Sequence, residues 1–349
     1  MSTAETGPAP FTIMSTMLLA GDVGGTKTLL GLFRNGPAER PRPFVVREFA
    51  TLDFDSLGEM VDAFFDDVGD QTVDAACIGA AGPVTGMVAR LTNVPWLVDG
   101  ARLGERLNDC PVALLNDLEA MAYAVPLLDD DELAVLQEGV PAPAGNAALI
   151  AAGTGLGEAL LHNVDGRFLP SPSEGGHADF AARTPREQAL VAELTRMHGR
   201  VDNERVISGP GLVNLFRFTH GTQDLRKACP VIGPAEDVAT LPAAIATTAM
   251  AGRCEQCAEA LEMFVEAYGA EAGNHALRSA ATAGIYIGGG IAPKLLPALE
   301  RGTFLAAFCD KEPLTDMLRT LPVFVILNPQ AGLIGAAIRA AEIATGSRP

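Results

Sequence analysis

Three glycine-rich segments, each next to a short apolar run, constrain the fold more than any other feature of this chain. They occupy residues 21–28 (GDVGGTKT), 151–157 (AAGTGLG) and 288–293 (GGGIAP). Glycine lets the backbone approach a ligand closely, and successive N–H groups in such turns form concave anion sites. Two phosphate-sized turns and a third open glycine turn favour a nucleotide held between two domains, and therefore a phosphoryl-transfer enzyme.

The length and composition set the broad class of the protein. The chain has 349 residues, of which 48% are hydrophobic, and this length favours about two domains. Charge, Thr or Gly interrupts every apolar run well before the ~18 residues that a membrane span needs. The first sixteen residues lack the basic start of a secretory signal. We expect residues 1–16 to be a disordered tail, and the protein to be cytoplasmic and free of the membrane.

The net charge excludes one class of partner. Acidic residues number 43 and basic residues 25, which gives a net charge of −18. Nucleic-acid binding needs clustered Lys and Arg, so we expect no nucleic-acid partner. An acidic protein that binds a nucleotide must use backbone amides, a helix N-terminus or a divalent cation.

The cysteines are predicted to be free thiols, because their spacing is sparse and a reducing cytoplasm disfavours disulfides. Cys254 and Cys257 form one C-x-x-C within a helical pattern. Zinc sites need four ligands, and no second ligand pair accompanies this one. The sequence therefore favours a structural role for both residues.

The hydrophobic pattern predicts strands that alternate with helices, and so a mostly parallel sheet with helices on its faces. A strand, a glycine turn and a second strand occur twice, about 130 residues apart, which suggests two similar halves. Expected strands cover residues 17–20, 28–33, 44–49, 72–79, 112–115, 147–152, 158–163, 284–287 and 323–327. Expected helices cover residues 57–68, 184–198, 253–279 and 330–344, residues 127–146 are interpreted as a linker, and residues 219–241 are left unassigned.

Neither of the first two glycine turns fits a common nucleotide motif. A Walker A loop needs Gly directly before Lys, but Thr26 precedes Lys27 here. The second turn has glycines at 153, 155 and 157, and a strand follows it, whereas a dinucleotide fingerprint needs G-x-G-x-x-G and a helix. Each turn alone could be a plain glycine hairpin, but three together favour a ligand site.

Two acidic positions carry both a chemical and a structural interpretation. Asp22 at the first turn could hold Mg²⁺ through water, or could cap the turn. Asn116 with Glu119 resembles a capping box at a helix start. Asp117 between them would stay ionised at a helix N-terminus and could accept the proton of an attacking hydroxyl.

A polar loop at residues 173–177 (SEGGH) offers Glu174 and His177 to the hydroxyls of a sugar. A lone His is more often structural, and the neighbouring Glu and glycines favour a functional role here. By spacing alone, residues 202–211 (DNERVISGPG) are interpreted as the start of a helix.

Together these segments resemble a known family. Residues 21–26, 153–157 and 288–293 resemble the two phosphate motifs and the adenosine motif of the actin-like sugar kinases. Residues 91–93 (LTN), 116–117 (ND), 174–177 (EGGH) and 204–211 (ERVISGPG) are similar to the bacterial glucokinase family. The resemblance implies an actin-like ATPase, ribonuclease H-like α/β fold with a central cleft. Its small domain would comprise residues 17–127 with 330–346, and its large domain residues 128–329.

The resemblance also implies a reaction, ATP-dependent phosphorylation of glucose at its 6-hydroxyl, with Asp117 as general base. It implies a homodimer, and it implies that Asp22 approaches Mg²⁺ through water. The implied sugar-binding residues are Asn93, Asn116, Asp117, Glu174, His177 and Glu204. The implied nucleotide-binding residues are Asp22, Gly24, Gly25, Thr26, Gly153, Thr154, Gly155, Gly288, Gly289 and Gly290. Alternatives are a kinase for another hexose or amino sugar, and a sugar-sensing regulator.

One departure concerns metal. Relatives in the sugar-kinase group that includes repressors carry a cysteine-rich zinc loop after the Gly-His pair. Here residues 178–180 (ADF) follow that pair, which points away from that group and from zinc.

Overall fold

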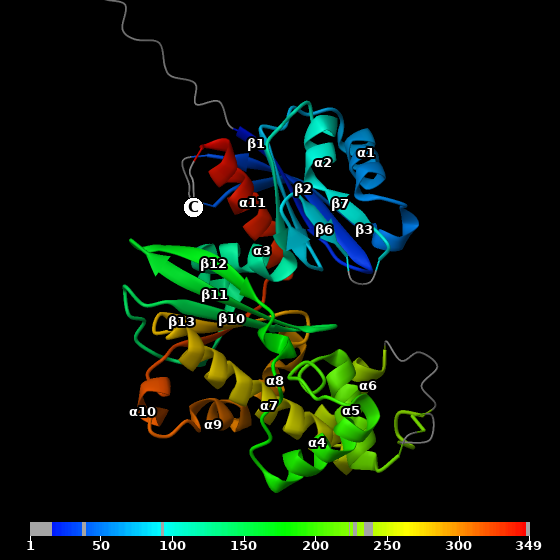
Figure 1. Ribbon diagram of the computed structural model, residues 1–349, viewed down its shortest axis with the longest axis vertical. Helices are drawn as coiled ribbons and strands as arrows, with labels where there is room; N and C mark the ends of the chain where they lie inside the picture. Colours follow the sequence, from blue (N-terminus) through cyan, green and yellow to red (C-terminus); the bar gives the residue numbers. More distant parts are fainter. Residues whose placement is uncertain are drawn as a thin grey trace, which may run out of the picture. The chain divides into compact units, whose positions relative to one another are not determined.

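The computed structural model describes residues 16–36, 40–91, 94–222, 224–225, 229–233 and 240–346. These residues form two compact units (Figure 1). The first runs up to Asp117 and resumes at Ala336, and the second spans Leu118–Gly335. Among the described residues, no helix combines the length and the apolar character needed to cross a bilayer.

The first unit is built on a five-stranded sheet in the order β3-β2-β1-β4-β8. Its strands β1, β4 and β8 are parallel; β2 is the antiparallel neighbour of β1, and β3 is the antiparallel neighbour of β2. These strands are β1 (Thr16–Val23), β2 (Lys27–Asn35), β3 (Arg42–Ala50), β4 (Ala75–Ala80) and β8 (Val112–Asn116). A second, three-stranded sheet contains β5 (Val84–Thr85), β6 (Val88–Arg90) and β7 (Leu97–Asp99).

Two helices bury apolar side chains against the first sheet. Helix α1 (Leu57–Val68) begins at Ser56, whose side chain accepts a hydrogen bond from the Glu59 amide at 3.2 Å. Helix α2 (Gly100–Arg106) begins at Asp99, whose carboxylate caps it in the same way. Such caps satisfy backbone donors that a helix start leaves unpaired. The core between helices and sheet includes Leu19, Leu30, Leu32, Met60, Val61, Phe64 and Leu103.

The second unit repeats this plan in a six-stranded sheet of order β12-β11-β10-β13-β14-β9. Strands β10, β13 and β14 are parallel, and β11 and β12 are antiparallel neighbours on the β10 side. The bounds are β9 (Leu133–Gln137), β10 (Ala147–Ala152), β11 (Leu156–Val164), β12 (Arg167–Ser173), β13 (Gly284–Gly288) and β14 (Val323–Ile326). The predicted repeat of strand, glycine turn and strand is therefore confirmed.

The helices of the second unit gather mainly on one face of its sheet, where α7 packs against β10 and β13 (Figure 1). They are α4 (Pro185–His198), α5 (Gly209–His220), α6 (Leu241–Met250), α7 (Glu255–Ser279), α8 (Leu296–Leu299), α9 (Thr303–Cys309) and α10 (Thr315–Leu318). Short 3-10 turns are η1 (Thr51–Asp53), η2 (Val125–Leu127), η3 (Asp130–Glu132), η4 (Gly175–His177) and η5 (Ala292–Leu295). Helix α7 buries Phe264 and Tyr268 in the centre of the core.

Two helices extend across the division between the units. Helix α3 (Asp117–Ala124) follows β8, and α11 (Ala331–Ala344) ends the described chain. In the second unit, a Cβ at Gly335 would lie 1.6 Å from the Ala120 carbonyl oxygen. Glycine at that position therefore lets α11 approach α3.

The interpretation of residues 127–146 as a linker is wrong in part. Residues 133–137 form β9, which pairs with β14 at the edge of the second sheet. An edge strand such as β9 is short, and its hydrophobic and polar residues alternate only weakly. The acidic, Gly and Pro residues on either side of it obscured this pattern in the sequence. Helix α6 and strand β12 were also absent from the expected elements.

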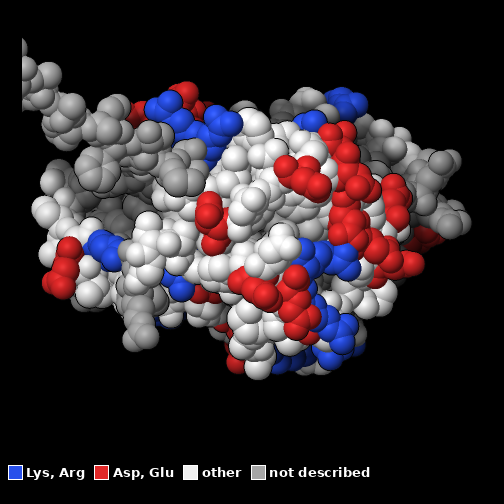
Figure 2. Space-filling view, turned by 90° about the horizontal axis from the view of Figure 1, so that it is seen from above, with Lys and Arg blue, Asp and Glu red and all other residues white. Residues whose placement is uncertain are grey.

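Basic side chains do not collect into one broad surface on the face shown in Figure 2. There the described Lys and Arg residues are scattered among Asp and Glu residues, and a band of acidic side chains runs beside them. This distribution agrees with the net charge of −18. A nucleotide would therefore depend on local devices in the turns.

Candidate active site

The first glycine turn joins β1 to β2 and is held from outside by one buried threonine. The Gly24 amide donates to the Lys27 carbonyl at 3.0 Å across the turn. Thr51 donates its hydroxyl to the Gly24 carbonyl at 2.9 Å and its amide to the Thr26 carbonyl at 3.0 Å. Thr51 thus donates hydrogen bonds to two carbonyls of the turn, and these bonds fix the backbone of the turn. Thr51 was missed because a threonine after a strand has no sequence signal of its own.

Asp22 lies two residues before this turn, at the carboxyl end of β1. Its neighbour on β4 is Gly79, which in turn neighbours Leu115 on β8. Burial, and secondarily the charge of Asp117, raise the pKa of Asp22 to about 6, while Lys27 lowers it. A carboxylate that is costly to ionise without a counter-charge fits a cation site.

Asn116 and Asp117 close β8 at the same edge of the first sheet. Asn116 pairs with Ala80 in the β4–β8 register, and its side-chain amide donates to the Gly82 carbonyl at 3.3 Å. Helix α3 begins at Asp117, whose side chain is exposed. Carboxyl ends of parallel strands meet at one edge, where α/β sheets bind ligands. The predicted helix start is confirmed, and it places the Asp117 carboxylate at the sheet edge that also carries the first turn.

The second glycine turn joins β10 to β11 and sits against the start of a helix. The Gly153 amide donates to the Gly155 carbonyl at 2.8 Å. The Gly209 amide, at the first residue of α5, donates to the Gly153 carbonyl at 2.8 Å. The positive end of a helix dipole beside a glycine turn favours bound phosphate. Thr154 is exposed at the tip of this turn.

Below the second turn lies a buried hydroxyl that sequence reasoning missed. The Ala152 amide donates to the Tyr268 hydroxyl at 3.2 Å. The same hydroxyl lies 3.4 Å from the Ile150 carbonyl and 3.5 Å from the Gly288 carbonyl. Tyr268 thereby joins the ends of β10 and β13 from within the core. Its place in an apolar helix pattern is typical of packing and gave no sign of this bond.

The third glycine turn packs directly on the end of β10. Gly289 has φ +82°, and a Cβ there would lie 2.4 Å from the Ala152 carbonyl oxygen. The Ile291 amide donates to that carbonyl at 3.3 Å. A Cβ at Gly290 would meet nothing within 4 Å. The second and third turns therefore lie at one edge of the second sheet, as a nucleotide site requires.

The expected sugar loop forms η4 and pairs with the segment before α5. The Glu204 amide donates to the Gly176 carbonyl at 2.9 Å, and the Glu204 carboxylate accepts from the Leu156 amide at 2.9 Å. His177 Nδ1 lies 3.5 Å from a carboxylate oxygen of Asp202. Glu174 and His177 are both exposed. The second unit thus brings Glu204 and the loop of Glu174 and His177 next to the second turn.

Behind the sugar loop lies a buried charged cluster that was also missed. Glu158 on β11 is only 1% exposed, and Arg278 donates to it at 3.1 Å. Burial, and then the nearby Glu271, raise its pKa against the pull of Arg278. A Cβ at Gly175 would lie 2.1 Å from the Glu158 carboxylate. The paired glycines of the loop therefore have a packing cause, since a Cβ at Gly175 would collide with Glu158 and a Cβ at Gly176 would lie 2.0 Å from the Leu156 carbonyl oxygen.

The predicted residues fall into two sets, one in each unit. Asn93 lies outside the described residues, so its predicted role stays a prediction. The first unit holds Asp22, Gly24, Gly25, Thr26, Asn116 and Asp117. The second unit holds Gly153, Thr154, Gly155, Glu174, His177, Glu204, Gly288, Gly289 and Gly290.

Comparisons with known proteins show the family to which this chain belongs. A family model described as glucokinase matches residues 19–343. A glucokinase of Nostoc punctiforme is 38% identical over 340 residues, which cover 94% of this chain and all of that protein. The crystal structure of a glucokinase from an Antarctic psychrotroph superposes with a TM-score of 0.81 at 29% identity, covering 93% and 99% of the two chains.

A more distant structure shares the fold. The ROK family glucokinase of Streptomyces griseus, solved in complex with glucose and AMPPNP, has a TM-score of 0.61 at 21% identity. It covers 93% of this chain and 99% of that one. The expected actin-like sugar-kinase fold is thus confirmed. Because the family model and the relatives extend over nearly all of it, the chain belongs to the glucokinase family.

Proposed function

We propose that this protein transfers a phosphoryl group from ATP to the 6-hydroxyl of glucose, with Asp117 as general base. Family membership supports the reaction, and the S. griseus relative was solved with both glucose and an ATP analogue. The observation that carries the residue assignment is the placement of Asp22 and Asp117 at the same edge of the first sheet, at the ends of β1 and β8, where the charge of Asp117 helps to raise the pKa of Asp22. It joins a candidate cation site to a candidate base.

The glycine turns bind phosphate in this proposal. Their backbone amides and the start of α5 place positive charge where the phosphoryl oxygens become negative, which stabilises the transition state. Asp22 would hold Mg²⁺ through water, and the ion would supply positive charge to the phosphates. Asp117 accepts the proton that the sugar hydroxyl loses, which contributes roughly 10²–10⁴ in rate.

Glu174, His177, Glu204, Asn116 and Asn93 bind the sugar hydroxyls in this proposal. The sites are polar, so a sugar that lacks one hydroxyl leaves a buried group unpaired. Enzymes built in this way reject such analogues by up to ~10⁴–10⁵. Expected homodimer formation and a cytoplasmic location remain part of the proposal.

The test of the base is the variant Asp117→Asn. It should keep the Tm within about 2 °C, because the side chain is exposed, and lose about 10²-fold or more in kcat. The matched variant Glu119→Gln, two residues further along α3, should keep its kcat. Activity of Asp117→Asn within tenfold of the unmodified enzyme would remove Asp117 from this role.

A matrix of sugars and donors tests the substrates. Glucose, mannose and glucosamine are each assayed with ATP, ADP and polyphosphate, and product is measured directly. Glucose with ATP should give the highest kcat/KM. A higher value for another hexose or amino sugar would move the assignment to that substrate, and sugar binding without turnover under any donor would favour a sensor.

A further inference from the structure

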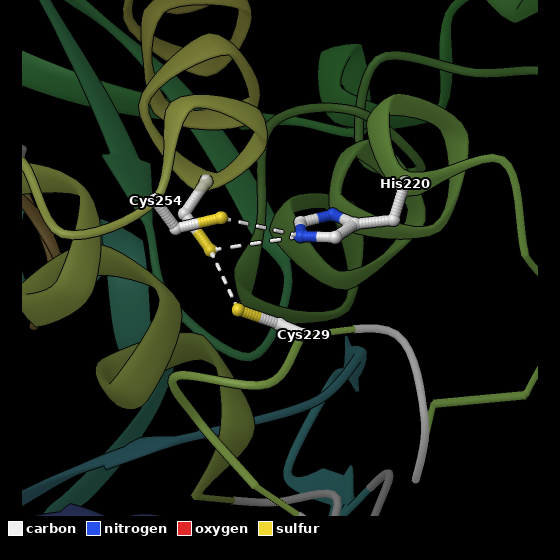
Figure 3. A group of neighbouring side chains, drawn as sticks. His220, Cys229 and Cys254 are labelled. Atoms are coloured by element: carbon white, nitrogen blue, oxygen red, sulfur yellow. Dashed lines mark hydrogen bonds between the residues drawn. The ribbon is translucent and has the colours of Figure 1, made fainter.

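Four side chains that the proposed reaction does not use converge in the second unit (Figure 3). They are His220, Cys229, Cys254 and Cys257, and their ligand atoms all lie within 4.8 Å of one another. The sequence offered Cys254 and Cys257 without a second ligand pair. The fold supplies that pair, because His220 lies 34 positions before Cys254 and Cys229 lies 28 positions before Cys257.

The spacing of these atoms is that of a tetrahedral ligand set. A zinc ion with Zn–S bonds of about 2.3 Å and a Zn–N bond of about 2.0–2.1 Å sets ligand atoms about 3.6–3.8 Å apart. Here the sulfurs of Cys257 and Cys229 lie 3.9 Å apart. His220 Nε2 lies 3.5 Å from the Cys254 sulfur and 4.0 Å from the Cys257 sulfur. Small inward shifts would close the set around one ion.

The histidine is oriented as a metal ligand. His220 Nδ1 lies 2.8 Å from the Phe216 carbonyl oxygen. A carbonyl only accepts, so Nδ1 carries the proton and Nε2 presents its lone pair to the sulfurs. Ligating histidines in proteins commonly donate their other nitrogen to a carbonyl in this way. The ring also packs against Phe216, with centroids 4.1 Å apart and the ring planes tilted by 40°.

Three separate elements deliver the four ligands. His220 is the last residue of α5, and Gly221 ends the helix in a left-handed conformation. Cys254 is the N-cap of α7, and Cys257 lies in its first turn.

Cys229 lies at the start of a tight turn, which fixes the position of this ligand. The Gly233 amide donates to the Cys229 carbonyl at 3.1 Å, and Gly233 has φ +75°.

We propose that His220, Cys229, Cys254 and Cys257 bind one structural Zn²⁺ ion. Three sulfurs and one imidazole in a tetrahedral set select zinc over the oxygen-preferring Mg²⁺. With all four positions filled by protein, no open position is left for a substrate, so the ion ties α5, the 229–233 turn and the start of α7 together. This assignment is independent of the reaction, since it uses none of the proposed substrate-binding residues.

The first experiment measures zinc in the full-length protein after incubation with Zn²⁺ and gel filtration. About one ion per chain is expected. Cys254→Ser and His220→Ala, both at half-buried positions, should lose at least tenfold in bound zinc. Cys309→Ser is the matched control, because Cys309 is buried in the same core but outside the cluster. Equal zinc in all four proteins, or almost none in the unmodified one, would overturn the proposal.

A second measurement does not depend on how the variants fold. Co²⁺ added to the metal-stripped, unmodified protein should give the strong sulfur-to-cobalt charge-transfer absorption of a thiolate site, and Zn²⁺ should abolish it. Zn²⁺ should also raise the Tm of the stripped protein, because binding to the folded state alone stabilises it. Absence of the absorption, or a Cys229–Cys257 disulfide in non-reducing mass spectrometry of freshly prepared protein, would contradict a zinc site.

Discussion

The two glycine hairpins, β1–β2 and β10–β11, have the same strand frame but different chemistry. Each first strand has an antiparallel partner on one side and a parallel strand on the other. Asp22 lies opposite Gly79 on the parallel neighbour, and Ala151 lies opposite Gly288. One hairpin therefore carries a half-buried acid where the other carries a methyl group. A shared backbone gives phosphate-sized turns twice, and single side chains decide which turn handles a cation.

The largest expected effect comes from removing that acid. Asp22→Asn should lower kcat/KM for ATP by about 10²–10³, because a pre-positioned electrostatic group at the transferring phosphate is worth about 2.7–4 kcal/mol. Ala151→Asn, the matched change in the second hairpin, should cost less. Steady-state kinetics across Mg²⁺ concentrations measure both. Equal losses would mean that the two hairpins do not differ as described.

The next effect concerns the backbone of the second sheet edge. Gly289→Ala forces a Cβ to within 2.4 Å of a carbonyl oxygen at a positive φ, and strain of this kind costs about 1–3 kcal/mol or more. Gly290→Ala meets open space and is the control. We expect Gly289→Ala to lower the Tm and to weaken ATP binding, as thermal unfolding and a nucleotide titration would reveal. Equal Tm values for the two variants would argue against the close approach.

The same Asp22→Asn variant, which should lower activity, should raise the stability of the folded protein. Folding raises the pKa of Asp22 from 3.8 to about 6, so the folded state holds this proton more tightly than the unfolded state. The contribution of Asp22 to the free energy of unfolding therefore falls as pH rises from about 4 to 6. Without nucleotide or Mg²⁺, Asp22→Asn should be about 1–3 kcal/mol more stable than the unmodified protein at pH 7.5. At pH 4 the gain should nearly vanish in chemical unfolding, and a gain independent of pH would contradict the assignment.

The smallest effect tests the support of the second hairpin. Tyr268→Phe removes the hydroxyl that accepts the Ala152 amide, and an unpaired buried donor costs about 1–3 kcal/mol. Tyr286→Phe, on β13, serves as the control. Urea unfolding should show the loss only for Tyr268→Phe, with kcat nearly unchanged. A large fall in kcat instead would give Tyr268 a more direct part in the site.

Local signals predicted the turns and most of the elements around them. The strand pairs flanking both glycine turns, helix 57–68 and the third turn were all recoverable, because each has a clear period and a glycine at its end. Thr51, Tyr268 and Glu158 were not recoverable. They act through contacts with residues far along the chain, and in the sequence they look like ordinary strand-end, core and strand residues.

The cysteine cluster also depends on contacts between residues that lie far apart in the chain. Cys254 and Cys257 were visible as a pair, but two ligands do not define a metal site. Residues 219–241 had weak periodicity and were left unassigned, although Cys229 and His220 lie within them. The packing of α5 against α7 brings His220 to the pair, and the turn at residues 229–233 brings Cys229 to it.

The first unit takes its residues from both ends of the chain, up to Asp117 and again from Ala336. Domains commonly fold in order as the ribosome produces them. Here the amino-terminal unit cannot be completed during most of synthesis, because its last helical turns follow the whole of the second unit in the chain. A newly made chain therefore passes through a stage in which the second unit is whole and the first is unfinished, and premature termination near residue 336 would leave that first unit permanently incomplete.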